Sequence, residues 1–193
     1  SETLFDMEEA LKQSNGLYGY LTLASQATAH GSPDILLEPV SSMKKVFIDK
    51  SMFKRGKPFA PSIQLAQNEY ESMQVAIIPA YDSLKNLTWN ISSFTNAAGD
   101  VLACDLRLVG HLKTEQPAIK VDHVGWWPDI LLEDVVSLKT LPYTDIITLW
   151  ATVRSTPNQS PGVYSGQVNV SADNVPPSSI DIQVEVWDFA IPK

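Results

Sequence analysis

The feature that most constrains the fold is a two-residue hydrophobic period that recurs along most of the chain. It is clearest at 180–188, where aliphatic residues alternate with polar ones, and it returns at 146–154 and 163–171. A strand with one buried and one solvated face produces this pattern, because successive side chains point to opposite faces of a sheet. These segments therefore predict strands that each bury one face.

Further short runs of this kind are separated by Pro, Gly, Asn and Asp, with no helical period between successive strands. The pattern predicts an all-β chain, an antiparallel β-sandwich, rather than a parallel sheet with helical crossovers. The expected strands lie near residues 45–49, 62–67, 72–78, 86–91, 104–112, 146–154, 163–171 and 180–188.

The first 43 residues have a different character. Leu4, Met7 and Leu11 fall at helical spacing and Asn15-Gly16 follows, so residues 4–14 predict a short amphipathic helix. The sequence therefore predicts a lead-in segment at 1–43, a short helix plus irregular chain, followed by a β-sandwich accessory domain at 44–193.

Charge and composition exclude several functions. The 14 Lys and Arg against 22 Asp and Glu give a net charge of −8, which argues against a nucleic-acid partner. No apolar run is long enough for a membrane-spanning helix. The single cysteine, Cys104, excludes an internal disulfide and a cysteine zinc site.

Catalytic signatures are missing from the sequence. The histidines His30, His111 and His123 have no metal-ligand spacing, and neither a nucleophile elbow nor a phosphate-binding glycine motif occurs. Glu133 and Asp134 are adjacent, and adjacent side chains on an extended segment diverge. We therefore expect no catalytic residue, no metal and no cofactor in this chain.

Aromatic residues favour a contact surface instead. Trp126 and Trp127 cannot easily enter one core from one strand, and Trp187 and Trp150 lie on the polar faces of their strands, which predicts that a partner covers part of the sandwich. Exposed rings are also platforms for the apolar faces of sugars. Our candidate docking or glycan-contact residues are Trp126, Trp127, Asp129, Trp187 and Glu69.

Two segments also predict local backbone geometry. Pro161-Gly162 suits a tight turn in which glycine takes a positive φ. Gly166 lies inside the following expected strand, where glycine indicates a bulge or the close approach of another segment or ring.

Three motifs in order resemble a known family. They are the Gln67-Asn68-Glu69-Tyr70-Glu71-Ser72-Met73-Gln74 segment, the Gly125-Trp126-Trp127-Pro128-Asp129-Ile130-Leu131 segment, and a third that runs from Trp150 through Pro161-Gly162-Val163-Tyr164-Ser165-Gly166 to Val186-Trp187-Asp188-Phe189-Ala190-Ile191-Pro192. Together they resemble the N-terminal β-sandwich domain of glycoside hydrolase family 123 and related bacterial proteins of unknown function. The resemblance covers about residues 45–193.

The resemblance implies a role for the chain. In that family the sandwich precedes a catalytic barrel that carries the catalytic carboxylates, so it implies a non-catalytic accessory domain that packs on a C-terminal barrel of the same polypeptide. It also implies an extracytoplasmic protein of carbohydrate metabolism, either periplasmic, cell-surface or secreted. The alternative is a carbohydrate-binding module that holds a glycan on exposed tryptophans.

Overall fold

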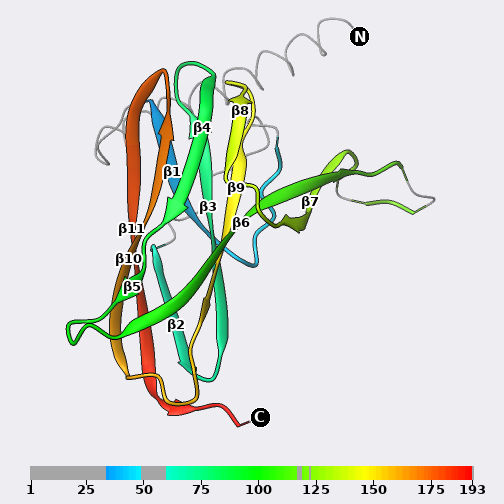
Figure 1. The fold of residues 1–193 in the computed structure, drawn as a ribbon. Coiled ribbons are helices and arrows are strands. Elements are labelled where there is room, and N and C mark those ends of the chain that lie inside the picture. Colours follow the sequence, from blue (N-terminus) through cyan, green and yellow to red (C-terminus); the bar gives the residue numbers. More distant parts are fainter. Residues whose placement is uncertain (1–33, 49–59, 117–118, 122, 193) are drawn as a thin grey trace, which may run out of the picture.

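The computed structural model describes residues 34–48, 60–116, 119–121 and 123–192, and within them the chain is all-β (Figure 1). Helices are absent from this described part, and so is any helix able to cross a bilayer. The strands are β1 (Ile35–Ser41), β2 (Ser62–Gln67), β3 (Tyr70–Pro79), β4 (Leu84–Ile91), β5 (Phe94–Thr95), β6 (Val101–Lys113), β7 (Trp126–Leu132), β8 (Ser137–Leu141), β9 (Ile147–Arg154), β10 (Gly162–Ala172) and β11 (Val175–Ala190).

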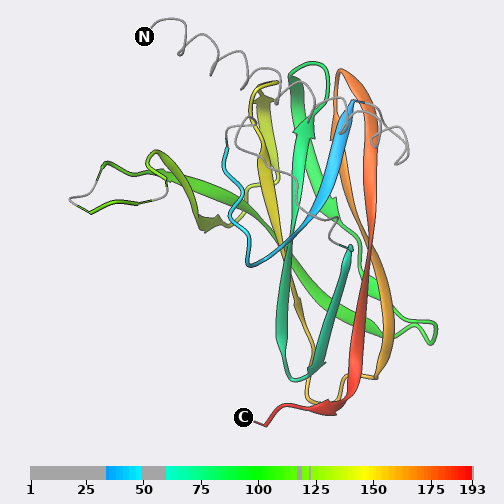
Figure 2. The ribbon, with the colours of Figure 1, turned by 180° about the vertical axis from the view of Figure 1, so that it is seen from behind.

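The strands form one sheet that curls on itself. Its order is β1-β3-β9-β6-β5-β10-β11-β2, with β7 beside β6 and with β4 and β8 branching from β10 (Figure 2). Neighbours are antiparallel except β2 and β11, which are parallel. The expected strictly antiparallel arrangement is therefore wrong at this pair. No hairpin joins β2 to β11, so the turn geometry that enforces antiparallel pairing does not act on them.

The inner face of the curled sheet holds the main hydrophobic core. Strands from both halves contribute to it, and its largest fully buried side chains include Tyr164, Phe94, Leu65 and Met73. The alternation predicted at 180–188 is confirmed, because Ile182, Val184 and Val186 lie in this core while the residues between them are exposed.

Of the two predictions from glycine, one is confirmed and one is confirmed in part. Gly162 has a φ of 131°, in the region that favours glycine, but it is the first residue of β10 and pairs with Val186 rather than lying in a tight turn with Pro161. At Gly166 a Cβ atom would lie 2.6 Å from the Phe94 ring, so the ring packs directly on the glycine backbone. The β10–β11 register runs through Gly166 without a shift, which makes this a close approach rather than a bulge.

The sheet begins earlier than the sequence pattern predicts. Strand β1 lies within the expected lead-in and pairs with β3 along its whole length. Its Ile35–Val40 run is mostly apolar and nearly all buried, so the two-residue alternation that marks a half-solvated strand is absent. The helix predicted at 4–14 lies outside the described residues.

The strand predicted near 45–49 is wrong. The crossing segment, which we define as residues 42–48, is not a strand and instead passes over the outer face of the sheet. Ser41 and Lys44 accept hydrogen bonds through their carbonyls from Gln74 on β3, and Val46 packs in a second small cluster. That cluster consists of Leu36, Val40, Val46, Ala76, Ile78 and Ile146.

The sequence pattern also missed β7 and β8. Strand β7 pairs with the second half of β6, and a register shift at Gly110/His111 interrupts their ladder. This β6–β7 arm, which we define as residues 108–116, 119–121 and 123–132, extends sideways from the body of the sheet (Figures 1 and 2). It carries the Trp126-Trp127-Pro128 motif.

Candidate functional site

The two adjacent tryptophans of the arm have different environments. Trp126 is 49% exposed, whereas Trp127 is half-buried against the crossing segment. The Trp127 ring lies edge-on to Phe47, with centroids 5.5 Å apart, and to His123, at 5.6 Å. Its indole N–H donates to the His123 carbonyl. Strand alternation thus assigns Trp127 to packing and leaves Trp126 open.

At the base of the arm, where the crossing segment meets β7, most of the remaining groups hold these two segments together. Lys45 donates from Nζ to the Pro128 carbonyl at 3.1 Å, which ties the crossing segment to β7. The His123 ring lies on Phe47 with centroids 4.1 Å apart, and its Nε2 is buried with no hydrogen-bond partner in the described chain. Asp129 is exposed on β7.

A second aromatic group lies at the end of β11. Trp187 is 39% exposed and Phe189 is 54% exposed, and their rings stack with centroids 5.7 Å apart and an angle of 22° between planes. Here β11 is irregular: Val186 pairs with Leu65 and Ala190 with Gln67, so four steps on β11 match two on β2. The bulge presents both rings on the outer surface beside the chain exit.

Glu69 belongs to the turn between β2 and β3, near this end of the sheet. Its Oε2 accepts a hydrogen bond from the Ala66 backbone N–H at 2.6 Å, and its own N–H donates to Ser155 Oγ. The preceding Asn68 has a φ of 64° and donates to the Ile191 carbonyl. These bonds make Glu69 a turn-stabilising residue, while the neighbouring Asn68 holds the chain where it leaves β11.

The candidate residues thus lie in two separate places. Trp126, Trp127 and Asp129 belong to the β7 side of the arm, whereas Trp187 and Glu69 belong to the end of the sheet where the chain leaves β11 (Figure 1). They do not form one surface.

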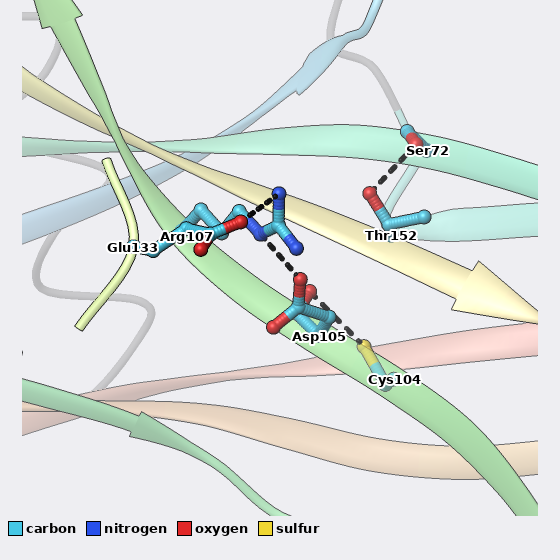
Figure 3. Close-up of polar contacts among 6 residues, drawn as sticks. All are labelled: Ser72, Cys104, Asp105, Arg107, Glu133 and Thr152. Atoms are coloured by element: carbon cyan, nitrogen blue, oxygen red, sulfur yellow. Dashed lines mark hydrogen bonds and ion pairs between the residues drawn. The ribbon is translucent and has the colours of Figure 1, made fainter. Parts of the chain in front are cut away.

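The sequence pattern missed a polar cluster on the outer face of β3, β9 and β6. Arg107 donates from Nε to Asp105 at 2.6 Å and from Nη1 to Glu133 at 3.1 Å (Figure 3). Beside them Ser72 Oγ donates to Thr152 Oγ1 at 3.1 Å. The sequence could have shown only that these residues lie on the polar faces of their strands. Their pairing requires the strand register, which the sequence does not supply.

Cys104 is not arranged as a nucleophile. Burial raises the pKa of its thiol to about 12, and the charge of Asp105 acts in the same direction. A thiol with such a pKa stays protonated near neutral pH, and the thiolate is the reactive form. Likewise, no group of three His, Cys, Asp or Glu side chains able to hold a metal ion occurs among the described residues.

No protein-family model matches this chain, and neither does any curated protein sequence. Its fold is similar to that of a family 123 glycoside hydrolase from Clostridium perfringens that acts on glycolipid glycans, with a TM-score of 0.64 and 18% identity. The match covers 82% of this chain and 28% of that one, so this chain spans less than a third of the hydrolase. The fold is therefore family-123-like.

Two further solved structures are more distant. AvmM, which catalyses macrocyclization in alchivemycin A biosynthesis, gives a TM-score of 0.42 at 8% identity, covering 83% of this chain and 91% of its own. MyfA, the major subunit of Myf fimbriae from Yersinia enterocolitica, gives 0.34 at 10% identity, covering 77% and 94%. Similarity at these scores carries no functional argument.

Proposed function

We propose that this chain is a non-catalytic accessory domain of a longer carbohydrate-active protein, in which the curled sheet serves as the β-sandwich that packs on a C-terminal barrel. Two findings support the proposal: the family-123-like fold, and a match that spans 28% of the hydrolase. In the resembled family the catalytic carboxylates belong to the barrel. We also propose that the parent protein is bacterial and works outside the cytoplasm.

The observation that carries the proposal is the apolar surface where the chain leaves β11. Trp187, Phe189 and Ile191 are each more than a third exposed there, next to the Ile191-Pro192 exit. Exposed contiguous apolar groups of this kind mark interaction surfaces. The nearby Asn68 and Glu69 are engaged in turn contacts, so the exposed rings are the groups that this surface offers to a partner barrel.

The test uses two proteins, the chain alone and the polypeptide in which a barrel follows it. The Trp187→Ala/Phe189→Ala double variant is compared with Trp126→Ala by calorimetry. Covering two rings contributes about 3 kcal/mol. The Tm shift per kcal/mol decreases as a protein becomes longer, because the unfolding entropy grows with the number of residues. We therefore expect the double variant to lower Tm by about 3 °C in the longer protein and hardly at all in the chain alone. Equal effects in both proteins would refute docking at this surface.

The alternative is a carbohydrate-binding module. The observation in its favour is Trp126, a ring 49% exposed on the projecting arm, on the strand that also carries the exposed Asp129. A glycan array probed with the folded chain and with Trp126→Ala separates the two functions. Binding that disappears with this ring would establish a glycan-binding arm, whereas binding unchanged by Trp126→Ala would exclude the arm as its site.

A further inference from the structure

The outer face of β3, β9 and β6 is organised in cross-strand rows. Gln74, Trp150 and Arg107 are direct partners in one row, and Ser72, Thr152 and Asp105 are partners in the next. All six side chains point away from the core, because the residues between them, such as Met73 and Ala151, lie in it. Direct partners have Cβ atoms about 5 Å apart. Trp150 therefore lies beside Arg107.

The indole of Trp150 keeps its polar atom available. Its ring is half-buried, and its N–H donates no hydrogen bond to a described residue. The buried polar atoms without partners in the described chain are those of Trp89, His123 and Thr148, and Trp150 is not among them. The Trp150 N–H therefore reaches solvent, and its row is closed on one side by Gln74, whose amide is held by the crossing segment.

The charged groups beside Trp150 are fixed but accessible. Arg107 lies between Asp105 and Glu133, and the three side chains are 38%, 54% and 69% exposed, respectively (Figure 3). A guanidinium has five N–H donors, and two of them are used here. One cation against two carboxylates leaves a local charge of −1. The cluster offers both donors and acceptors in a set geometry.

A second ring lies further along the same face. Tyr70 is the β3 partner of Arg154, one row beyond Ser72 and Thr152. It is 64% exposed, and the Arg154 guanidinium lies 6.0 Å from its ring centroid. Trp150 and Arg154 are four residues apart on β9, so the two rows are separated by about 13 Å. Between the two rings lie the Ser72 and Thr152 hydroxyls and the Asp105 carboxylate.

We propose that this face binds a neutral oligosaccharide. Trp150 and Tyr70 contact the apolar C–H faces of two sugar units, and the Asp105–Arg107–Glu133 cluster holds hydroxyl groups between and beside them. A hydroxyl both donates and accepts, which matches carboxylates and guanidinium donors placed side by side. The spacing of the rings fits a chain of sugar units better than a single one.

The charge near Trp150 disfavours acidic ligands. Phosphorylated, sulfated and uronic acid groups bound there would meet the Asp105 and Glu133 carboxylates and the one Arg107 cation, and like charges at short range are unfavourable; the second cation, Arg154, lies at the Tyr70 end of the face. The proposal is independent of docking through Trp187 and of glycan binding by Trp126, because it uses the opposite half of the sheet from β11 and none of the arm aromatics.

The experiment is a glycan array of neutral, sialylated and sulfated glycans, followed by calorimetric titration of the best neutral oligosaccharide. The chain is compared with Trp150→Ala, Trp150→Phe, Arg107→Gln and Tyr70→Ala, and with Trp126→Ala and Trp187→Ala as matched ring controls. Circular dichroism and thermal unfolding establish that each variant is folded. Trp150→Phe keeps an aromatic platform without the N–H, so it remains informative if Trp150→Ala does not fold.

We expect Trp150→Ala and Arg107→Gln to weaken binding at least about tenfold, because rings and arginines at the centre of a contact carry most of its affinity. Tyr70→Ala should weaken it less, Trp150→Phe should be intermediate, and both controls should bind as the unchanged chain does. Silence across the array, a preference for acidic glycans, or binding that only the control variants abolish would overturn the proposal. Glycan binding that is lost only in Trp187→Ala would also count against the proposed docking of Trp187 on a barrel.

Discussion

The β10–β11 hairpin and the β6–β7 arm are both long antiparallel ladders, but they differ in what covers them. In β10–β11 the inner face is buried along most of its length, as at Tyr164 and Val184, and the outer face is mostly polar, with exposed apolar side chains at Val163 and at the Trp187–Phe189 end. In the arm Leu112, Trp126 and Ile130 are all more than a third exposed. Alternation of apolar and polar residues therefore marks strands that share one core. The β6–β7 arm extends beyond the core, so its apolar residues do not alternate regularly with polar ones.

The largest effect should come from Tyr164 in β10. It is fully buried, its hydroxyl donates to the Ser160 carbonyl at 2.7 Å, and it accepts from Gln159. We expect Tyr164→Ala to cost about 3–5 kcal/mol of unfolding free energy, and Tyr164→Phe about 1 kcal/mol. The measurement is urea unfolding. Leu112→Ala in the arm is the counterpart and should change stability by less than about 0.5 kcal/mol. Similar losses at both positions would abolish the contrast.

Gly166 tests how tightly the same hairpin is packed. An added methyl group would lie 2.6–2.8 Å from three Phe94 ring atoms, so the ring must move. We expect Gly166→Ala to cost about 1–3 kcal/mol, the usual range for overpacking a core.

The double variant Gly166→Ala/Phe94→Leu identifies the cause of that loss. If the ring is responsible, the two substitutions together cost less than the sum of the singles, and a double-mutant cycle measures the difference. Additive losses would show that Gly166 is needed for its backbone alone.

Within the arm, Trp127 and Trp126 should differ although they are neighbours in sequence. Trp127 loses edge contacts with Phe47 and His123 and one hydrogen bond when truncated, so Trp127→Ala should cost about 1–2 kcal/mol. Trp126→Ala should stay within about 0.5 kcal/mol. Thermal unfolding of the two variants provides the test. The reverse order would mean that Trp126, and not Trp127, anchors the arm.

The same contrast explains how far the sequence could predict the molecule. Strands β2, β9, β10 and β11 were found because one face of each meets the core. Strand β1 was missed because it is buried on both faces, and β7 because its Trp126-Trp127-Pro128 run shows no alternation.

The candidate site follows the same logic. Alternation separates Trp126 from Trp127 only once β7 is known to be a strand. The contact of Arg107 with Glu133 depends on the β6–β7 register, which contains a shift at Gly110/His111. Local pattern carries no information on such a shift. The sequence nevertheless predicted that Trp150 points outward, because Trp150 lies among the polar residues of its alternating strand.

The smallest effect should be the pH dependence that His111 gives to the base of the arm. Burial lowers the pKa of its imidazole, and the hydrogen bond between its Nε2 and the Val46 carbonyl, at 3.4 Å, opposes this only in part. Above about pH 6.5 the ring is neutral in both the folded and the unfolded chain. As the pH falls below that value the unfolded chain takes up the proton first, so the unfolding free energy decreases.

Urea unfolding between about pH 7 and pH 5 should show this decrease, before most carboxylates titrate. His111→Gln retains a donor for Val46 and cannot titrate, so it should flatten the slope. An unchanged slope in that variant would place the titrating group elsewhere in the chain.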